Sequence, residues 1–571
     1  MACYSARPMR RLLLILLLVL FPTLSLAQSK TDMLDQLASD FWAWRAKYRP
    51  FNGDDIPRLE RPGGTRDWSA AAISKQREDL AGFERRWTSM DTANWPVTKH
   101  VDYRLMGSAI ARVRWELDVN PRWQRDPTFY LEQTIGALAE ELAPPPPFAQ
   151  GRSEEIIARV ENIPAILEEG KGNLKAIAPF AQLATASLGD ISERMASVER
   201  GVAPLLAGDP QRTRFHVAIS KASQTLVEYR DWLNANLPGM RRNFALGAEA
   251  YSFFLHKVAL LPYTPQELLA MSRQDFERVL TFESLERQHD LGGPDWKIPA
   301  TAEEEAARMA QAESATRRFL AEHEILSVPA DLPHWTLRPL PDYLAALDGF
   351  TEADDFTGPS RLHEDGVRWI YPPSPHLPYF SDAYLKDPRT TGVHEGMPGH
   401  FLQLSLSWRN PDPIRRHYYD SSANEGIGFY AEEMMLQAGL YDDSPRTREI
   451  IYSFARLRAL RVEVDVRLAL GEYTIAQAAD YLARTVPMDR KTAESEAASF
   501  ATAPGLAIAY EIGKLQIQGM LGERRLQLGD KFNLREFHDY VWSNGNVPFS
   551  LQRWELLGLD DQIRKSDELA K

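Results

Sequence analysis

The sequence has almost no cysteine and no surplus of positive charge. Cys3 is the only cysteine among 571 residues, so disulfide bonds within the chain are excluded, and thiolate metal ligands or a catalytic cysteine are excluded beyond its first residues. Lysine and arginine number 66 against 79 aspartate and glutamate, which gives a formal net charge of -13. Because a surface of this sign repels phosphate backbones, we expect no nucleic acid among the partners.

Long hydrophobic runs are also scarce. The one long run, residues 12–21, follows three arginines and precedes small residues up to Ala27. This pattern is typical of a secretory signal peptide, so we expect residues 1–27 to be removed and the protein to be exported, either periplasmic or secreted. An uncleaved anchor is the alternative, but the run is shorter than the roughly 20 residues that span a bilayer. After cleavage we expect no stable membrane insertion, and no cysteine near Ala27 could carry a lipid.

The overall composition is that of a soluble globular protein. Hydrophobic residues make up 44% and charged residues 25% of the chain, which excludes a disordered, collagen-like or polytopic membrane protein. The length suggests more than one structural unit of about 150 residues. We expect an N-terminal helical domain over residues 28–250 and a metal-binding catalytic domain over residues 251–571.

The local signals predict mostly helices. Thr264, Pro265 and Glu267 form a capping-box pattern that opens a helix, and the run 292–294 (Gly-Gly-Pro) must end it. The same pattern recurs at Thr301–Glu304 and Thr474–Gln477. Other helix-like stretches lie at 153–162 and 211–237, with a break at the four prolines 144–147.

The composition changes over residues 325–389, and the change predicts a small sheet. Prolines and aromatic residues become dense there, which suits irregular chain and short strands. We expect a small β-sheet lying against the helix that follows. The predicted fold class is therefore mainly α, with a small β-sheet beside the active-site helix.

One dense cluster of ionisable residues has the composition of a metal site. His394 and Glu395 are followed by His400. Zinc in catalytic sites is commonly bound by three imidazole or carboxylate ligands and a water. A glutamate beside the first histidine is placed to take the proton of that water as a general base.

The spacing of the two histidines requires a bend. They are six residues apart, so on a regular helix they would point about 120° away from each other. Pro398 and Gly399 lie between them, and these residues interrupt helices. We therefore predict a kink or bulge between Met397 and His400 that brings the second imidazole back.

A third ligand is expected from a later helix. Asn424 is placed as its N-cap and Gly439 as its end. Glu425 follows His400 by 25 residues, enough for a helix, a loop and a return. Glu432 is two turns further along the same face, so it could support a ligating histidine.

Three strings resemble the motifs of a known family. HEGMPGHFLQ (394–403), NEGIGFYAEE (424–433) and APGLAIAYEIGK (503–514) look like three motifs of the bacterial family known as domain of unknown function 885. That family is grouped with zincin-like metallopeptidases whose third ligand is a glutamate, the gluzincins. The sequence departs from the family pattern at Phe401, Ile427 and Leu506.

The resemblance implies a large helical zincin-like metallopeptidase fold and a set of roles. His394, His400 and Glu425 would hold one zinc ion, and Glu395 would be the general base. Tyr510 falls at the family's tyrosine, where a phenol could stabilise an oxyanion, although a tyrosine on an apolar helix more commonly packs.

Two further groups of residues each allow two interpretations. The tyrosines and histidine between the ligand helices either contact substrate or belong to an ordinary loop: His417, Tyr418 and Tyr419. Four arginines on one expected helix either form salt bridges or include one that binds a substrate carboxylate: Arg456, Arg458, Arg461 and Arg467. Asp465 on that helix is expected to be structural.

The sequence predicts a zinc-dependent hydrolase, a peptidase acting on peptide substrates with Glu395 as general base. A metal-dependent hydrolase of non-peptide amides or esters is the second interpretation. The third is a non-catalytic peptide-binding or scaffold protein with a relic site. The position of the cleaved bond, the native metal and the oligomeric state stay open.

Overall fold

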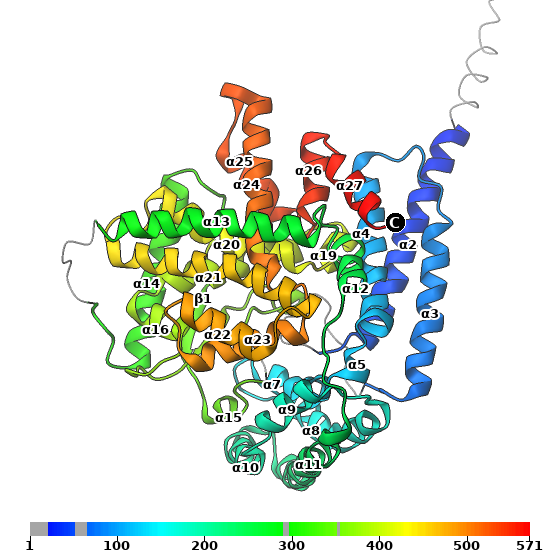
Figure 1. The fold of residues 1–571 in the computed structure, drawn as a ribbon, viewed down its shortest axis with the longest axis vertical. Helices are drawn as coiled ribbons and strands as arrows, with labels where there is room; N and C mark the ends of the chain where they lie inside the picture. Colours follow the sequence, from blue (N-terminus) through cyan, green and yellow to red (C-terminus); the bar gives the residue numbers. More distant parts are fainter. Residues whose placement is uncertain (1–20, 52–65, 289–295, 351–353) are drawn as a thin grey trace, which may run out of the picture.

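The structure, a computed structural model, describes residues 21–51, 66–288, 296–350 and 354–571, with side chains from residue 33 onward (Figure 1). The expected signal peptide lies outside the described residues up to residue 20, and residues 21–27 belong to helix α2. The expected helix stop at 292–294 also lies outside them. Among the described residues, no helix is both long and apolar enough to cross a bilayer.

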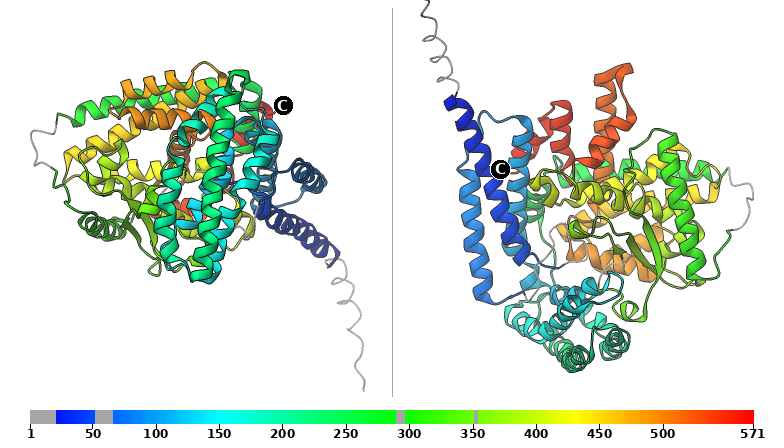
Figure 2. Two further views of the ribbon diagram at one scale, coloured as in Figure 1. Left: turned by 90° about the horizontal axis from the view of Figure 1, so that it is seen from below. Right: turned by 180° about the vertical axis from the view of Figure 1, so that it is seen from behind.

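The first part of the chain covers two sides of the molecule. Helices α2 (Phe21–Tyr48), α3 (Ala70–Thr88) and α4 (Val97–Arg114) lie side by side along one edge (Figures 1 and 2). A second group, which includes the paired helices α8 and α11, forms the lower end in Figure 1. The elements after α4 are η1 (Trp115–Val119), α5 (Arg122–Arg125), α6 (Pro127–Leu131), η2 (Glu132–Gly136), α7 (Ala137–Leu142), α8 (Gln150–Asn173), α9 (Ala178–Ser187), α10 (Ile191–Val202), η3 (Ala203–Leu205), α11 (Asp209–Asn236), η4 (Leu237–Gly239), α12 (Ala248–Phe253) and η5 (Phe254–Val258).

The second part is a stack of helices around a small sheet. Helices α13 (Pro265–Glu286), α20 (Ser421–Ala438) and α21 (Pro445–Leu470) run across it, and α24 (Ile508–Leu528) crosses α20 and projects with α25 (Leu534–Ser543) beyond the rest (Figures 1 and 2). The remaining elements are α14 (Ala302–Glu322), α15 (Asp342–Ala345), η6 (Pro359–Arg361), α16 (Tyr379–Lys386), α17 (Arg389–Thr391), η7 (Gly392–Gly396), α18 (His400–Trp408), α19 (Pro413–His417), α22 (Ile475–Thr485), α23 (Arg490–Thr502), η8 (Gly529–Lys531), α26 (Phe549–Leu557) and α27 (Asp561–Leu569).

The structure confirms the predicted starts of three helices. Thr264 and Thr474 open α13 and α22 with reciprocal capping boxes. Thr301 caps α14 by accepting from the backbone N–H of Glu304, but the Glu304 carboxylate accepts from Ala300 instead of closing the box. The stretches at 153–162 and 211–237 lie in α8 and α11, apart from the last residue, and the prolines 144–147 separate α7 from α8.

The expected small sheet is present and lies against the segment that carries His394. Strand β3 (Gly366–Ile370) is central, parallel to β1 (Trp335–Pro339) and antiparallel to β2 (Asp354–Asp355). Trp335 packs under Gly396, where a Cβ atom would lie 2.8 Å from its ring. The mainly α fold with a small sheet beside the His394 segment is therefore confirmed.

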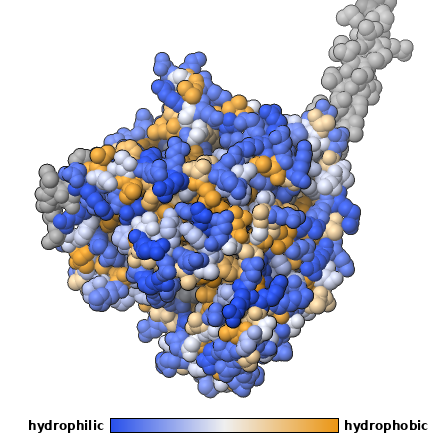
Figure 3. Space-filling view, in the orientation of Figure 1, coloured by the Kyte–Doolittle hydropathy of each residue, from blue (hydrophilic) through white to orange (hydrophobic). Residues whose placement is uncertain are grey.

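The hydrophobic core links distant parts of the chain. One buried cluster joins Leu37, Leu138 and Leu226 with Trp369 and Leu551, so side chains from both sides of residue 250 pack together. The division into two domains at that residue stays a prediction. On the outside, Figure 3 shows hydrophilic residues over much of the face, interspersed with hydrophobic ones.

Candidate metal centre

The segment between the two histidines is bent as predicted. The wide helical turn η7 ends at Gly396, Met397 is extended with φ -123° and ψ 117°, and α18 begins at His400. Gly399 lies so close to His394 that a Cβ atom would be 1.7 Å from the His394 carbonyl oxygen. The Nε1–H of Trp542 donates to the Pro398 carbonyl at 2.6 Å and holds the bend from outside. The second histidine therefore starts a new helix that faces the first.

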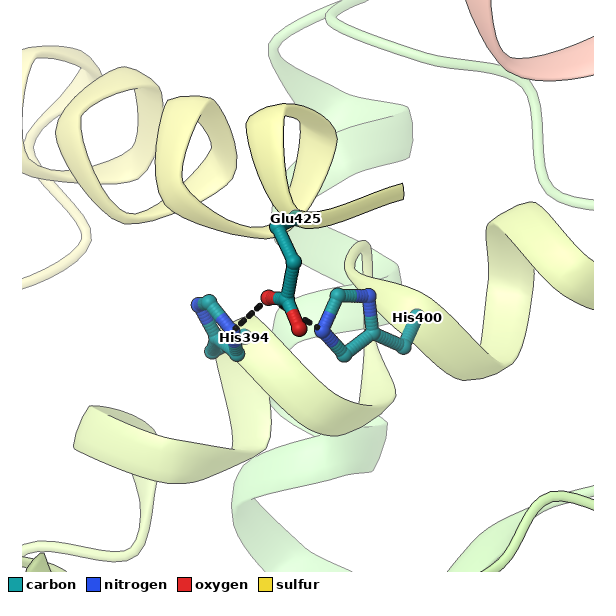
Figure 4. Close-up of side chains that lie close together, drawn as sticks. All are labelled: His394, His400 and Glu425. Atoms are coloured by element: carbon teal, nitrogen blue, oxygen red, sulfur yellow. Dashed lines mark ion pairs between the residues drawn. The ribbon is translucent and has the colours of Figure 1, made fainter. Parts of the chain in front are cut away.

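The three expected ligands converge (Figure 4). One donor atom from each of His394, His400 and Glu425 lies within 4.8 Å of the other two, and all three residues are buried. Both imidazole Nε2 atoms face Oε2 of Glu425, at 3.4 Å from His394 and 3.2 Å from His400 (Figure 4). The ring centroids are 4.7 Å apart with the planes at 82°. Two imidazoles and one carboxylate thus point at one small volume.

Helix α20 supplies the carboxylate and leaves room for both rings. Gly428 leaves this room, because a Cβ atom there would lie 2.9 Å from Cε1 of both His394 and His400. Gly426 meets Gly513 of α24, where a Cβ atom would lie 2.6 Å from the Gly513 α-carbon. These small residues let α20 approach both the histidines and α24.

The predicted start of α20 is wrong by one turn. Asp420, not Asn424, is the N-cap, and its carboxylate accepts from the backbone N–H of Ala423 at 3.2 Å. Asn424 lies inside the helix, and its Nδ2 donates to Gln403 of α18 at 3.2 Å. A capping acceptor one turn earlier extends the helix, which frees Asn424 to tie the two ligand helices together. The predicted end at Gly439 is confirmed, with φ 96°.

Glu432 supports His394 from behind, as its two-turn spacing from Glu425 predicts. Its Oε1 lies 2.7 Å from Nδ1 of His394 and accepts from Nη2 of Arg458 at 3.1 Å. Burial favours the neutral ring, but Glu425 and Glu432 outweigh it and raise the pKa of His394 to about 9. The same histidines hold the pKa of Glu425 far below its usual range despite burial.

Glu395 lines a cavity beside the three converging groups. Its Oε1 lies 3.2 Å from Nη1 of Arg368, which also donates to Asp354 at 3.0 Å. Burial would raise the pKa of Glu395, but Arg368 and the two histidines hold it below its usual value. The cavity has a volume of about 850 Å³, and Glu395, Arg368 and all three converging residues line it.

Tyr510 lies next to the first histidine. Its ring is stacked on His394 with centroids 6.1 Å apart and planes at 16°, and it lines the same cavity. The guanidinium carbon of Arg461 lies 4.6 Å from the centre of the tyrosine ring. The structure therefore brings all five residues named by the motifs to one cavity.

A family model described as "Bacterial protein of unknown function (DUF885)" matches residues 58–555. The chain belongs to this family. No curated protein matches it.

Solved structures share the fold of this DUF885 protein. A proposed lipoprotein of unknown function from Shewanella oneidensis is 20% identical, with a TM-score of 0.68 over 93% of this chain and 99% of that chain. A proposed lipoprotein from Colwellia psychrerythraea is 16% identical, with a TM-score of 0.71 over 95% and 99% of the two chains. At these identities the likeness shows the fold alone.

The remaining candidate residues divide into those that reach the cavity and those that do not. The histidine and tyrosines at 417–419 are absent from its lining, and Tyr418 is buried against Ser108, with their hydroxyl oxygens 2.7 Å apart. Asp465 is structural as expected, because its carboxylate accepts from the backbone of Gly505 and Ala507 at 2.9 Å. The four arginines all form ion pairs, and Arg458 and Arg461 also line the cavity.

Two features of the site were missed in the sequence. Arg368 stands between Val367 and Trp369 in a short apolar strand, and that isolated charge was the available signal. Gly428 follows Glu425 by about one helical turn, and a second glycine two residues after Gly426 inside a helix indicates a close approach by another segment. Both depend on a partner distant in sequence, which motif spacing does not reveal.

Proposed function

We propose that this DUF885 protein is a zinc-dependent hydrolase of the gluzincin type that cleaves peptides. The observation that carries the proposal is the convergence of His394, His400 and Glu425 within 4.8 Å. A zinc ion held there would polarise the scissile carbonyl and lower the pKa of the water that it binds.

The three residues fit one zinc ion in chemistry and in surroundings. Imidazole nitrogen and carboxylate oxygen are ordinary zinc ligands, and three of them leave a position for water. Glu432 lies at Nδ1 of His394, which orients the ring with Nε2 toward Glu425. Buried charged or polar groups aimed at one small volume are costly unless they are paired or share a cation, so the arrangement favours a bound metal.

Glu395 is placed to carry the proton. Arg368 fixes its carboxylate on one side at 3.2 Å, and an ionised carboxylate there is able to accept a proton at neutral pH. The same carboxyl group, once protonated, can deliver that proton to the leaving amine. Tyr510, beside His394, could donate a hydrogen bond to the developing oxyanion.

The cavity favours small substrates. A volume of about 850 Å³ is within the range of small-molecule sites. Its walls come both from the His394 region and from the N-terminal half, including Arg112, Trp115 and Phe129. We therefore propose short peptides, rather than folded proteins, as substrates.

Export from the cytoplasm is part of the proposal. The apolar run at 12–21 with its preceding arginines supports a signal peptide. Two proteins of the same fold are described as proposed lipoproteins. We infer a periplasmic or secreted location.

The direct test is hydrolysis of a short-peptide library by the purified protein loaded with zinc, compared with Glu395→Gln. We expect the wild type to cleave peptides and the variant to lose at least about 100-fold in kcat/KM while keeping its zinc. A parallel panel of ester and non-peptide amide substrates separates the second interpretation. Peptide binding without turnover on any substrate would instead support a relic site.

A further inference from the structure

Arg458 of α21 lines the cavity, and two of its guanidinium nitrogens make no hydrogen bond to the described residues. The residue is 4% exposed and lines the same cavity as His394 and Glu395. Its Nη2 donates to Glu432, whereas Nε and Nη1 make no hydrogen bond within the part of the chain that the structure describes. A buried charged donor without an acceptor is costly. A ligand in the cavity that supplied an acceptor would therefore be stabilised by this guanidinium.

Aromatic rings surround this guanidinium. Its central carbon lies 4.9 Å from the ring centre of Phe454, 5.4 Å from that of Phe380 and 5.9 Å from that of Phe429. Phe454 and Phe380 also line the cavity. Such rings attract a cation and exclude water, so a charge-assisted hydrogen bond to Arg458 would be strong there.

The neighbouring arginine is already occupied. Arg461 donates both Nε and Nη2 to Glu496 at 2.6 Å, a two-bond pair that uses its planar fork. Arg458 makes only one hydrogen bond, from Nη2 to Glu432, and the second N–H of Nη2 forms a two-donor edge with unbonded Nε or Nη1. A carboxylate accepts two parallel bonds from such an edge.

We propose that Arg458 binds the C-terminal carboxylate of the peptide substrate. Glu432 Oε1 contacts both Arg458 Nη2, at 3.1 Å, and His394 Nδ1, at 2.7 Å, so the guanidinium is adjacent to the first ligand. Because Arg458 and His394 both contact Glu432 and line one cavity, we expect a carboxylate on Arg458 to place a bond within one or two residues of the C-terminus beside the metal ligands. The inference rests on the proposed function and makes the protein a carboxypeptidase or dipeptidase.

The test uses pairs of short peptides of the same apolar sequence, one with a free C-terminal acid and one with a C-terminal amide. Hydrolysis is measured with the zinc-loaded protein, and binding is measured separately with the metal-free protein. We expect the wild type to favour the acid by at least about 30-fold in both measurements, as loss of a hydrogen bond to a charged group predicts.

Two variants and one control assign the preference to Arg458. Arg458→Lys keeps a positive charge opposite Glu432 but loses the planar fork, and Arg458→Gln loses both. We expect both to retain zinc and to bring the acid-to-amide ratio to within about 3-fold of one. Arg456→Lys, on the same helix beside Glu283 and outside the cavity lining, should keep the wild-type ratio.

Each result is decisive. Equal binding of acid and amide by the wild type, or a ratio that survives in both Arg458 variants, overturns the inference. A third peptide, amidated at its end but carrying a glutamate side chain, overturns the C-terminal assignment if it binds as tightly as the free acid. Acid-selective binding without hydrolysis of any peptide contradicts the proposed function alone, and hydrolysis without acid selectivity contradicts this inference alone.

Discussion

The α-carbon of Gly399 is packed against the carbonyl group of His394, and a Cβ atom at 399 would lie 1.7 Å from its oxygen and 2.4 Å from its carbon. This contact is how two histidines six residues apart come to face each other. The chain leaves the turn at Gly396, folds back over the carbonyl and begins a new helix at His400. The unusual spacing is thus a consequence of backbone packing that only glycine permits.

Replacement of Gly399 by alanine should abolish the site. The added methyl group meets backbone rather than a flexible side chain, so the bend has to open and His400 has to move. We expect a loss of about 3 kcal/mol or more of stability together with loss of zinc binding. Melting temperature and zinc content measure the two effects. Gly519→Ala is the matched control, because nothing lies within 4 Å of its Cβ position in α24. A Gly399→Ala protein with wild-type zinc affinity would contradict this role.

Gly428→Ala should separate metal binding from folding. Position 428 is inside α20, where alanine is favoured over glycine by about 1 kcal/mol. Its Cβ atom would press on Cε1 of both imidazoles at 2.9 Å, so the rings have to shift. We expect a folded protein with zinc affinity reduced about 10-fold to 100-fold.

Competition with a zinc chelator measures this affinity. Gly522→Ala, on α24 with open space at its Cβ position, should leave the affinity unchanged. Equal zinc affinity in Gly428→Ala and the wild type would show that the glycine does not set the spacing of the rings.

The sequence predicted helix starts well where the capping hydrogen bonds join side chains and backbone groups of residues that are close in sequence. Thr264 with Glu267 and Thr474 with Gln477 form the expected reciprocal bonds, because capping is complete within four residues. Asn424 shows the limit. It has the right chemistry for a cap, but Asp420 caps the helix one turn earlier and Asn424 bonds to Gln403 instead.

The site was predictable to the extent that its motifs are contiguous. The proline and glycine between His394 and His400 indicated the bend, and the two-turn spacing to Glu425 indicated the contact of Glu432 with His394. Arg368 and Gly428 could not be found in this way, because their roles depend on a strand and a ring that arrive from elsewhere in the chain.

A buried histidine outside the site should make stability depend on pH. Nδ1 of His538 contacts the Ile325 carbonyl at 2.8 Å, and Nε2 contacts the Tyr430 hydroxyl at 2.9 Å. Burial lowers the pKa of His538 from 6.5 to about 4, against a small opposing effect of the Ile325 carbonyl. Below pH 6.5 the unfolded chain takes up a proton here that the folded protein accepts only near pH 4. The titration of His538 therefore costs no stability above pH 6.5, and it lowers the free energy of unfolding by about 3 kcal/mol as the pH drops from 6.5 to 4.

His538→Asn isolates this contribution. Asparagine cannot be protonated but can still donate to the Ile325 carbonyl. We expect the variant to melt at a lower temperature than the wild type at pH 7.5 and to lose less of its melting temperature between pH 7.5 and 4.5. Parallel pH profiles for the two proteins would show that His538 does not titrate as the structure requires.

The most direct test of the central claim is the zinc content of the purified protein after reconstitution and removal of excess metal. His394, His400 and Glu425 converge from η7, α18 and α20, so we expect about one zinc ion per chain. His394→Ala, His400→Ala and Glu425→Ala should each lose it, whereas His216→Ala, an exposed histidine paired with Glu199, should keep it. A wild type that binds no zinc, or ligand variants that retain a full equivalent, would contradict the account.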